Sequence, residues 1–353
     1  MARRRGPGLV VHGGAPARWL DVGVNLNPLG VPDPVRQAVA AARFDRYADL
    51  DPRAAERHLA AGAGVAASAV LLTAGASEAL RLIAATELRP GVRALIAGPT
   101  YGEYARLATL SGADVTECRA TPPGFRPPVS ALERALCRAG PAVTFVCDPN
   151  NPTGRALTAA DLRRLVGALG APAGRPARRL LVIDQSFEPF ADRRSPVGEL
   201  VATGRVVIVR SLTKLLSSPG IRVGYIIAQP RLVSRLRSLR DPWPVGAHAI
   251  AAASAATWTL DPVARRQIRG WRRALADGLR ARGLRPCPSA ANFLLVEVGP
   301  AAEALVARTA RRRVAIRWCA SFGLPGFVRL AVRPPAEQAR LLDALDAILP
   351  TLP

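Results

Sequence analysis

The chain contains a single lysine, Lys214, among its 353 residues. Lysine and arginine together number 49, so removing this one lysine leaves 48 arginines. Arginine cannot replace lysine where an amine must lose its proton and attack a carbonyl carbon, because the guanidinium stays charged at any working pH. A sequence that drifts toward arginine would keep a lysine where this chemistry is required. Lys214 is therefore a candidate nucleophilic amine, and its surroundings must separate that role from a surface lysine kept by chance.

Other polar residues lie at the ends of predicted strands, where parallel sheets bind ligands. Asp184 closes the apolar run RLLVID, in which an isolated carboxylate would be costly unless it is paired. Lys214 follows the next apolar run, RVVIVR, and Arg222 lies eight residues further on. Residues 75–77 (Gly-Ala-Ser) lie where AVLLT turns into a predicted helix, which is the geometry of an anion-binding nest.

These residues meet the requirements of a pyridoxal phosphate site. An amine must form a Schiff base with the cofactor, and a carboxylate must keep the pyridine nitrogen protonated so that the ring accepts electrons. The phosphate needs backbone N–H groups at a helix N-terminus and an arginine fork. A flat side chain should cover the ring, and a donor should reach its hydroxyl oxygen. Asn151, in the polar turn PNNPTG (149–154), is a candidate for that donor.

Six motifs occur in the order TAGASEAL, PTYGEY, DPNNPTG, VIDQSF, SLTK and PGIRVGY. Together they resemble the class I/II aminotransferases, a family of fold-type-I pyridoxal phosphate enzymes. The resemblance covers essentially the whole chain and is specific as a set, although each motif alone is weak. It implies an α/β fold, with a large domain whose mostly parallel sheet lies between helices and a smaller α+β C-terminal domain. It also implies a homodimer with shared active sites.

The resemblance assigns roles to individual residues. Lys214 would form the Schiff base, Asp184 would face the pyridine nitrogen, and Asn151 would donate to the ring hydroxyl. Tyr101 would stack on the ring, and the segment YADLDP nominates Tyr47 as the tyrosine that a neighbouring subunit lends to the phosphate. The other phosphate-binding residues implied are Ala76, Ser77, Ser211 and Arg222.

Two positions depart from the family pattern. VIDQSF has Gln185 where a glutamate is common, and Phe187 where many transaminases have a tyrosine that hydrogen-bonds the ring oxygen. Without that hydroxyl, Asn151 is the main donor expected at the ring oxygen.

Two arginines on predicted C-terminal strands are candidates for substrate binding, Arg317 in VAIRWC and Arg329 in FVRLAV. Forked donors suit carboxylates and phosphates. The resemblance implies that Arg329 binds the substrate carboxylate, and that Arg317 helps to bind the phosphate of a phosphorylated substrate. The segments HGG (12–14) and NLNPLG (25–30) add His12 and Asn27 as substrate-binding candidates.

Those two segments, together with DPWPVGAHA (241–249) and Phe187, resemble the cobalamin-pathway branch of the family. We therefore expect an enzyme of the L-threonine O-3-phosphate decarboxylase type, acting on a small phosphorylated amino acid or amine. The alternative is a histidinol-phosphate aminotransferase, which transfers an amino group with 2-oxoglutarate and glutamate. The two reactions differ in which bond at Cα stands perpendicular to the cofactor ring, and the sequence leaves that choice open.

The elements that must position these residues follow from hydrophobic periodicity. Short apolar runs at 69–75, 93–98, 142–148, 179–184, 205–210 and 222–227 alternate with amphipathic stretches. This alternation predicts βαβ units and a largely parallel sheet covered on both faces. Two long helical stretches follow (about 246–257 and 261–283), then three short strands and a closing helix from about 335. We expect an N-terminal arm (1–32) that joins the small domain, a large cofactor-binding domain (33–240) and a small C-terminal domain (241–353).

Composition argues against other classes of protein. The formal charge is 49 minus 26, or +23, but the arginines are spread along the chain and form no basic tract with interleaved aromatics. Nucleic-acid binding is therefore a remote alternative. No apolar run is long enough to span a membrane, so we expect a cytoplasmic protein. Five cysteines without a CxxC pair and three scattered histidines predict neither a disulfide framework nor a metal site.

One motif is a false lead. Residues 62–67 read GAGVAA, which fits the dinucleotide-binding pattern G-x-G-x-x-A. That pattern needs a strand before it and a helix after it, whereas a helical run precedes this segment and a strand follows it. The segment is better explained as the C-terminal end of a helix.

Overall fold

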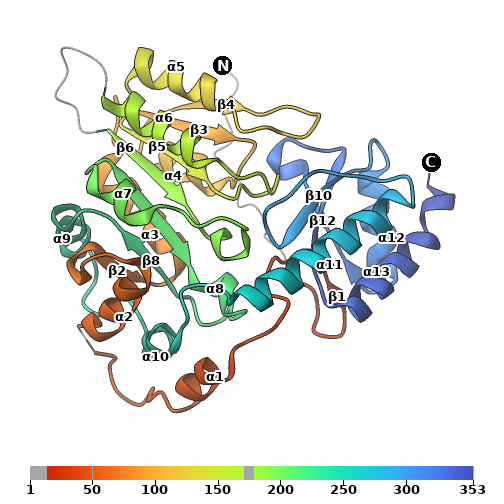
Figure 1. Cartoon of the computed structure of the whole chain (residues 1–353), viewed down its shortest axis with the longest axis horizontal. Coiled ribbons are helices and arrows are strands. Elements are labelled where there is room, and N and C mark those ends of the chain that lie inside the picture. The colour runs from red at the N-terminus through yellow and green to blue at the C-terminus, as the bar shows by residue number, and fades with distance from the viewer. Residues whose placement is uncertain (1–13, 50, 171–178, 353) are drawn as a thin grey trace.

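The computed structural model describes residues 14–49, 51–170 and 179–352 (Figure 1). Its strands form a seven-stranded, a four-stranded and a two-stranded sheet. The seven-stranded sheet has the order β2-β8-β7-β6-β5-β3-β4. Its strands are β2 (Val70–Thr73), β3 (Arg93–Gly98), β4 (Asp114–Arg119), β5 (Val143–Cys147), β6 (Leu180–Asp184), β7 (Val206–Ser211) and β8 (Gly224–Ile227).

The large sheet is mostly parallel, as the sequence predicted. The pairs β3–β4, β3–β5, β5–β6 and β6–β7 are parallel, whereas β8 runs antiparallel to both β2 and β7. Strand β4 was not predicted. It lies at the sheet edge and is largely exposed on both faces, so its sequence DVTECR lacks an apolar run.

Helices cover both faces because successive side chains of each buried strand point in opposite directions. Leu181 and Ile183 of β6 belong to one apolar cluster, and Leu180 and Val182 belong to the other. The first cluster is completed by α1 (Asp33–Ala40), α2 (Arg53–Ala63), α5 (Val129–Ala139), α6 (Ala159–Gly170), α7 (Val197–Ala202) and α10 (Ala247–Ala255). The second is completed by α3 (Gly75–Glu87), α4 (Glu103–Leu110) and α9 (Pro230–Ser238).

The C-terminal part has its own antiparallel sheet, of order β12-β13-β10-β9, and a separate apolar core (Figure 1). Its helices are α11 (Pro262–Arg280), α12 (Ala302–Arg311) and α13 (Pro335–Asp346). Its strands are β9 (Arg285–Pro286), β10 (Phe293–Glu297), β11 (Val314–Ala315), β12 (Arg317–Trp318) and β13 (Phe327–Ala331). Helix α11 begins after Asp261, whose carboxylate caps it by accepting from the N–H groups of Val263 and Ala264.

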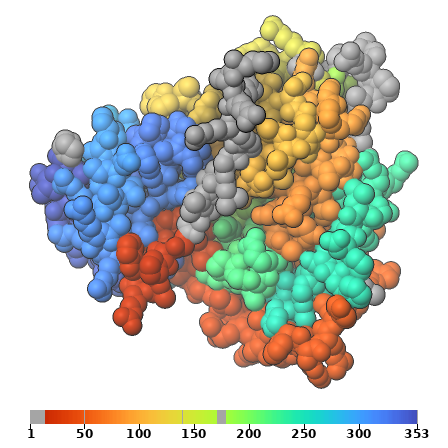
Figure 2. All heavy atoms as spheres, turned by 180° about the vertical axis from the view of Figure 1, so that it is seen from behind, coloured from red at the N-terminus to blue at the C-terminus, as the bar shows by residue number. Residues whose placement is uncertain are grey.

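The N-terminal arm joins this C-terminal part through strand β1 (Leu20–Asp21), which pairs in parallel with β11. Figure 2 shows the red segment that contains β1 lying against the blue C-terminal region. The predicted strand VAIRW is interrupted at Ile316, so that β11 pairs with the arm while β12 pairs with β13. Helix α10 packs against α1 and α2. We retain the division into 1–32, 33–240 and 241–353 as a proposal.

The GAGVAA segment is a helix end, as predicted. Helix α2 ends at Ala63, and Gly64 follows with a left-handed φ of 68°, a conformation that favours glycine. The short 3-10 helix η1 (Ala67–Ala69) then leads into β2. The segment therefore follows a helix and precedes a strand, which is the reverse of the order in a dinucleotide-binding motif. Among the described residues, no helix combines the length and apolar character needed to cross a membrane.

Candidate active site

A cavity of about 420 Å³ opens where the carboxyl ends of the large-sheet strands meet the N-terminal arm and strands β12 and β13. Ten residues predicted from the sequence line it, and they come from both the large-sheet part and the C-terminal part. They are Ala76, Ser77, Tyr101, Asn151, Asp184, Ser211, Lys214, Arg222, Arg317 and Arg329.

Lys214 lies in the short helix α8 (Leu212–Leu215), directly after β7. Its backbone carbonyl accepts a hydrogen bond from the N–H of Asn27 at 3.0 Å, which fixes the helix against the N-terminal arm. Burial, together with the charges of Arg329 and Arg222, lowers the pKa of the Lys214 amine to about 8. A buried amine with a lowered pKa has the character of a nucleophile for a carbonyl group.

Asp184 ends β6 and is held by three donors. The hydroxyl of Tyr104 donates to Oδ2 at 2.8 Å, while the N–H and hydroxyl of Ser186 donate to Oδ1 at 2.9 and 2.5 Å. Burial raises the pKa of the Asp184 carboxyl, and the hydrogen bonds from Ser186 and Tyr104 oppose that rise. The arrangement suits a carboxylate that faces a protonated ring nitrogen.

An anion site lies at the N-terminus of helix α3. Gly75 opens the helix with a φ of 78°, and a Cβ there would meet the Arg222 guanidinium at 2.9 Å. A Cβ at Gly224 would lie 2.8 Å from the N–H nitrogen of Ala76. The two glycines therefore let the guanidinium and the helix N-terminus approach closely. Together these groups fit the phosphate of the cofactor.

Arg329 links the two parts of the cavity. Its Nη1 donates to the side-chain oxygen of Asn151, and its Nη2 donates to the Gly23 carbonyl at 2.8 Å. Burial lowers the pKa of Arg329 to about 10. The guanidinium carbon also lies 5.4 Å from the centre of the Phe293 ring.

Arg317 lies directly opposite Arg329 on the neighbouring strand. Its Nη2 donates to the hydroxyl of Ser321 at 2.9 Å, and its guanidinium carbon lies 5.8 Å from the centre of the Phe322 ring. Four cationic side chains thus line the cavity, those of Lys214, Arg222, Arg317 and Arg329, whereas Asp184 is the one carboxylate among its described lining residues. Such a cavity attracts anionic ligands.

Two of the predicted residues, Asn27 and Tyr47, are not among the described residues that line this cavity. The side-chain amide of Asn27 donates to the Leu215 carbonyl and accepts from the N–H of Leu29, so it links the arm to α8, and a substrate contact for Asn27 stays a proposal. Tyr47 is 76% exposed and stacks on Trp243 with ring centres 4.3 Å apart. Its role toward a neighbouring subunit stays a proposal. His12 lies outside the described residues.

The structure adds residues that the sequence did not single out. Asn25 lines the cavity with only 3% exposure, and both polar atoms of its amide are buried without a hydrogen-bond partner in the part of the chain that the structure describes. A buried amide left unpaired in a cavity is a place for a ligand to bind. Its signal in the sequence was the motif NLNPLG, which contains both asparagines. Tyr104 and Ser186, the donors to Asp184, lie in the motifs PTYGEY and VIDQSF, but the sequence indicated no role for them.

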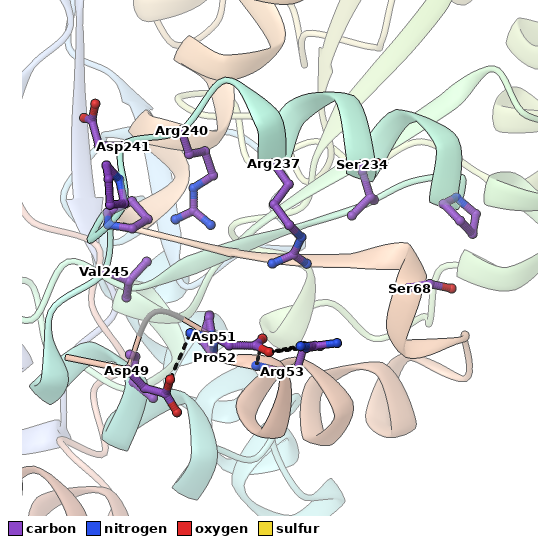
Figure 3. A pocket seen from close by; sticks show the side chains of 15 residues that line it. Asp49, Asp51, Pro52, Arg53, Ser68, Ser234, Arg237, Arg240, Asp241 and Val245 are labelled. Atoms are coloured by element: carbon purple, nitrogen blue, oxygen red, sulfur yellow. Dashed lines mark hydrogen bonds and ion pairs between the residues drawn. The ribbon is translucent and has the colours of Figure 1, made fainter.

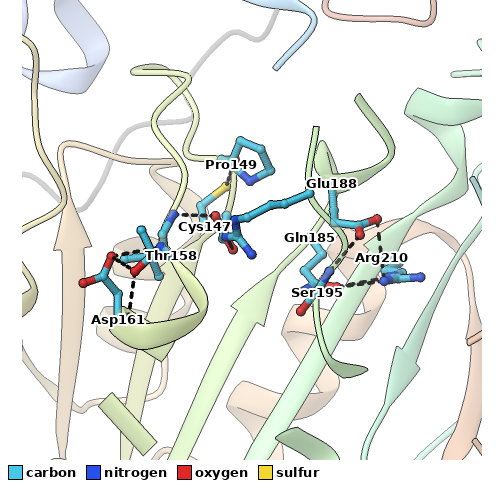
Figure 4. A network of polar contacts seen from close by, with 11 residues as sticks. Cys147, Pro149, Thr158, Asp161, Gln185, Glu188, Ser195 and Arg210 are labelled. Carbon is cyan, nitrogen blue, oxygen red and sulfur yellow. Dashed lines mark hydrogen bonds and ion pairs between the residues drawn. The ribbon is translucent and has the colours of Figure 1, made fainter. Parts of the chain in front are cut away.

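The two departures from the family pattern have different surroundings. Phe187 lines the cavity and packs edge-to-face on Phe293, with ring centres 5.0 Å apart. Gln185 is not among the residues that line the cavity, and it accepts hydrogen bonds from Arg210, which also lies 3.6 Å from Glu188 (Figure 4). The Gln185 departure therefore changes a buried network behind the site and leaves the cavity lining unchanged.

A second hollow of about 530 Å³ lies between α9, the start of α2 and the segment 241–245 (Figure 3). Arg237 and Arg240 line it, but they pair with Glu56 at 2.7 Å and Glu78 at 3.1 Å. It has no lysine and no strand-end carboxylate, so it lacks the groups that make the first cavity reactive.

The large mixed sheet, the strand-end lysine and carboxylate and the helix-terminal anion site define a pyridoxal phosphate enzyme of fold type I. The model of the aminotransferase class I and II family matches residues 17–348, and the chain belongs to that family. It is 35% identical to a histidinol-phosphate aminotransferase of Symbiobacterium thermophilum over 334 residues, covering 92% of this chain and 89% of that protein. It is 30% identical to histidinol-phosphate aminotransferase 2 of Pseudomonas fluorescens, covering 95% and 90%.

Solved structures agree on the fold. The histidinol-phosphate aminotransferase of Sinorhizobium meliloti in complex with pyridoxal-5'-phosphate has a TM-score of 0.85 and 24% identity, covering 94% of this chain and 91% of that one. The L-threonine-O-3-phosphate decarboxylase of Porphyromonas gingivalis has a TM-score of 0.79 and 25% identity, covering 94% and 100%. The protein is a pyridoxal phosphate-dependent enzyme of the aminotransferase family.

Proposed function

We propose that the protein is a transaminase that exchanges an amino group between a phosphorylated amine, histidinol phosphate, and 2-oxoglutarate. The observation that carries the proposal is the pair of arginines, Arg317 and Arg329, facing each other across β12 and β13 at the cavity. The sequence motifs led us to expect a decarboxylase of the L-threonine O-3-phosphate type first. The relatives named above, at 35% and 30% identity, favour the aminotransferase alternative instead.

The cavity residues fit the cofactor. Lys214 would bind its aldehyde carbon, Asp184 its ring nitrogen, and Arg222 with Ala76, Ser77 and Ser211 its phosphate. Tyr101 would cover the ring, and Asn151 would contact the ring hydroxyl. When bound, pyridoxal phosphate supplies an electron-accepting ring for the reaction at Cα. Lys214 would then move a proton at the Cα of the substrate, since it is the one amine of the cavity.

The arginine pair would hold the anionic groups of the two substrates in turn. Arg329, already oriented by Asn151 and Gly23, would bind a carboxylate of glutamate or 2-oxoglutarate. Arg317 and the unpaired amide of Asn25 would bind the phosphate of the amine. A forked guanidinium accommodates either a carboxylate or a phosphate, which suits a site that two different anions must share.

A second function has specific support. Phe187 lines the cavity where many transaminases have a tyrosine, and the fold matches that of an L-threonine-O-3-phosphate decarboxylase with 25% identity. Threonine phosphate carries both a carboxylate and a phosphate, and the two arginines could bind one each. This reading remains the alternative.

One experiment separates the two. The holoenzyme is incubated with histidinol phosphate and 2-oxoglutarate, and separately with L-threonine O-3-phosphate. Glutamate formed in the first mixture supports the transaminase, whereas carbon dioxide released in the second supports the decarboxylase. If neither product forms, the phosphorylated substrate is wrong, although the cofactor chemistry can still be tested with Lys214 itself.

A homodimer and a cytoplasmic location are further proposals. Tyr47 and Phe44 are highly exposed, at 76% and 82%, although both are aromatic. We propose that a second copy covers this loop and receives Tyr47 at its phosphate site, as the family resemblance implies. Sedimentation of the purified protein with and without pyridoxal phosphate tests the oligomeric state.

A further inference from the structure

Tyr104 is a fully buried tyrosine that lines the cavity next to Asp184. It lies in the first turn of α4, and its hydroxyl donates to Oδ2 of Asp184 at 2.8 Å. Its ring is stacked on Phe145 of β5, with centres 5.3 Å apart and planes 5° apart. It also meets the ring of Tyr101 edge-on, with centres 5.6 Å apart.

We propose that Tyr104 is a positioning residue of the cofactor site, which sets the orientation of the Asp184 carboxylate toward the cofactor ring nitrogen. The inference rests on the assignment of Asp184 as the partner of that nitrogen, and is independent of which substrate the enzyme uses.

The donors to Asp184 come from two different layers of the fold. Ser186 holds Oδ1 through its N–H and its hydroxyl, but it lies two residues away on the same strand end and moves with Asp184. Tyr104 holds Oδ2 from a helix on the face of the sheet. Rotation of the carboxylate about its Cβ–Cγ bond is therefore fixed relative to the sheet only when both oxygens are held. Tyr104 supplies the second of these two points.

The residue expected above the cofactor ring lies just before the same helix. Tyr101 lines the cavity and lies two residues before α4 begins, and the N–H of Tyr104 donates to the Tyr101 carbonyl at 3.3 Å. The stack on Phe145 locks Tyr104 to β5, the strand next to the one that ends in Asp184. The residue above the ring and the residue behind its nitrogen are thus placed by one rigid unit, whose two side chains pack on each other.

Charge supports the geometry. Burial raises the pKa of the Asp184 carboxyl, and the hydrogen bond from Tyr104 lowers it, so Tyr104 helps to keep the carboxylate ionised. Burial and the neighbouring Asp184 charge raise the pKa of the Tyr104 hydroxyl well above 10. The hydroxyl therefore keeps its proton at working pH and remains a donor to Asp184.

The test compares Tyr104→Phe with Tyr225→Phe, each of which removes one hydroxyl and keeps the ring. Tyr225 of strand β8 is a matched control, because its side chain is as fully buried as that of Tyr104 but its hydroxyl accepts from Arg210 at 3.5 Å. Asp184→Asn is measured in parallel. For each protein, the dissociation constant of pyridoxal phosphate, the pH titration of the visible absorbance of the bound cofactor and the unfolding of the apoprotein are recorded.

We expect Tyr104→Phe to weaken cofactor binding by about tenfold to a hundredfold, the effect of losing a hydrogen bond to a charged group. Its absorbance titration should shift to higher pH on the acid side, as protonation of Asp184 becomes easier. Tyr225→Phe should bind the cofactor as the wild type does.

Three results would overturn the proposal. In the first, Tyr104→Phe matches the wild type in cofactor affinity and titration. In the second, Tyr225→Phe changes them as much, which would mean general loosening of the core. In the third, Asp184→Asn leaves both unchanged, so that Asp184 is not the partner of the ring nitrogen and Tyr104 has nothing to position. None of these results bears on the substrate, which the product assay addresses separately.

Discussion

Arg317 and Arg329 face each other as directly paired residues on the antiparallel strands β12 and β13. Two like charges in this position repel, and the charge of Arg317 is one cause of the lowered pKa of Arg329. A fold does not keep such a pair in a partly enclosed cavity for stability. An anion that lies between or beside the two guanidinium groups relieves the repulsion. The pair therefore favours binding of an anionic substrate.

Replacing Arg317 with glutamine should therefore raise KM for the phosphorylated amine by about tenfold to a hundredfold, the loss of a charge-assisted hydrogen bond. The free energy of unfolding should stay the same or rise, since one of two repelling charges is gone. Steady-state kinetics and thermal unfolding measure the two effects. Arg285→Gln is the control, an exposed arginine of the same sheet that pairs with Glu297. An equal KM in the Arg317 variant and the wild type would contradict the assignment.

Much of the site could be predicted because its residues follow buried strands. A parallel strand covered on both faces reads as a continuous apolar run, and its carboxyl end must reach the same sheet edge as its neighbours' ends. That logic brought Asp184 and Lys214 together without a structure. It failed for β4, whose exposed edge position leaves a sequence with no apolar run.

The parts that were missed depend on contacts between distant segments. Asn25 and Asn27 lie two residues apart in one motif, and only the crossing of the arm over α8 decides which amide faces the cavity. Tyr104 acquires its role from the packing of α4 across β5 onto a residue 80 positions away. No local periodicity encodes such contacts.

The two asparagines give opposite predictions for the same substitution. Asn25→Leu should leave the unfolding free energy unchanged or raise it by about 1–3 kcal/mol, because an unpaired buried amide is removed. Asn27→Leu should lower it by a similar amount, because its amide is bonded to Leu215 and Leu29. Chemical denaturation of the apoproteins compares them. Only Asn25→Leu should also raise KM for the phosphorylated amine; if it is as unstable as Asn27→Leu, its amide has a structural partner.

Arg119 of β4 should tune substrate affinity from outside the cavity. Its Nη2 donates to the Phe322 carbonyl at 2.8 Å, and Gly323, with a φ of 70°, leaves room for that guanidinium. Phe322 lines the cavity beside Arg317. Arg119→Gln should therefore raise KM for the phosphorylated amine about fivefold, the typical effect of one lost hydrogen bond, with kcat nearly unchanged.

The control for Arg119 is Arg163→Gln, an exposed arginine of α6 that pairs with Glu199 of α7 and does not line the cavity. It should have the kinetics of the wild type. A fall in kcat at constant KM in the Arg119 variant would contradict the prediction, because it would place the effect on the chemical step.

Lys214→Arg should abolish covalent attachment of the cofactor while keeping the charge. A guanidinium cannot supply a neutral amine at any working pH. Borohydride treatment of the holoenzyme followed by mass spectrometry should find the cofactor at Lys214 in the wild type and at no arginine in the variant. Because the chain has no other lysine, side-chain labelling elsewhere cannot obscure the result. A reduced adduct at residue 214 of the variant would rule out the assignment.

The pKa of Lys214 sets how attachment depends on pH. Its value is lowered to about 8, and only the neutral amine attacks a carbonyl carbon. The rate at which the apoprotein joins pyridoxal phosphate should therefore rise about tenfold per pH unit up to pH 8 and level off above it, whereas a lysine with an ordinary pKa near 10.4 would keep rising. At pH 7 the neutral fraction is about 200 times that of an ordinary lysine. Stopped-flow absorbance from pH 6 to 10, with Nα-acetyl-lysine as the reference amine, measures both curves. If the protein's rate still climbs between pH 9 and 10, burial does not make Lys214 the nucleophile described here.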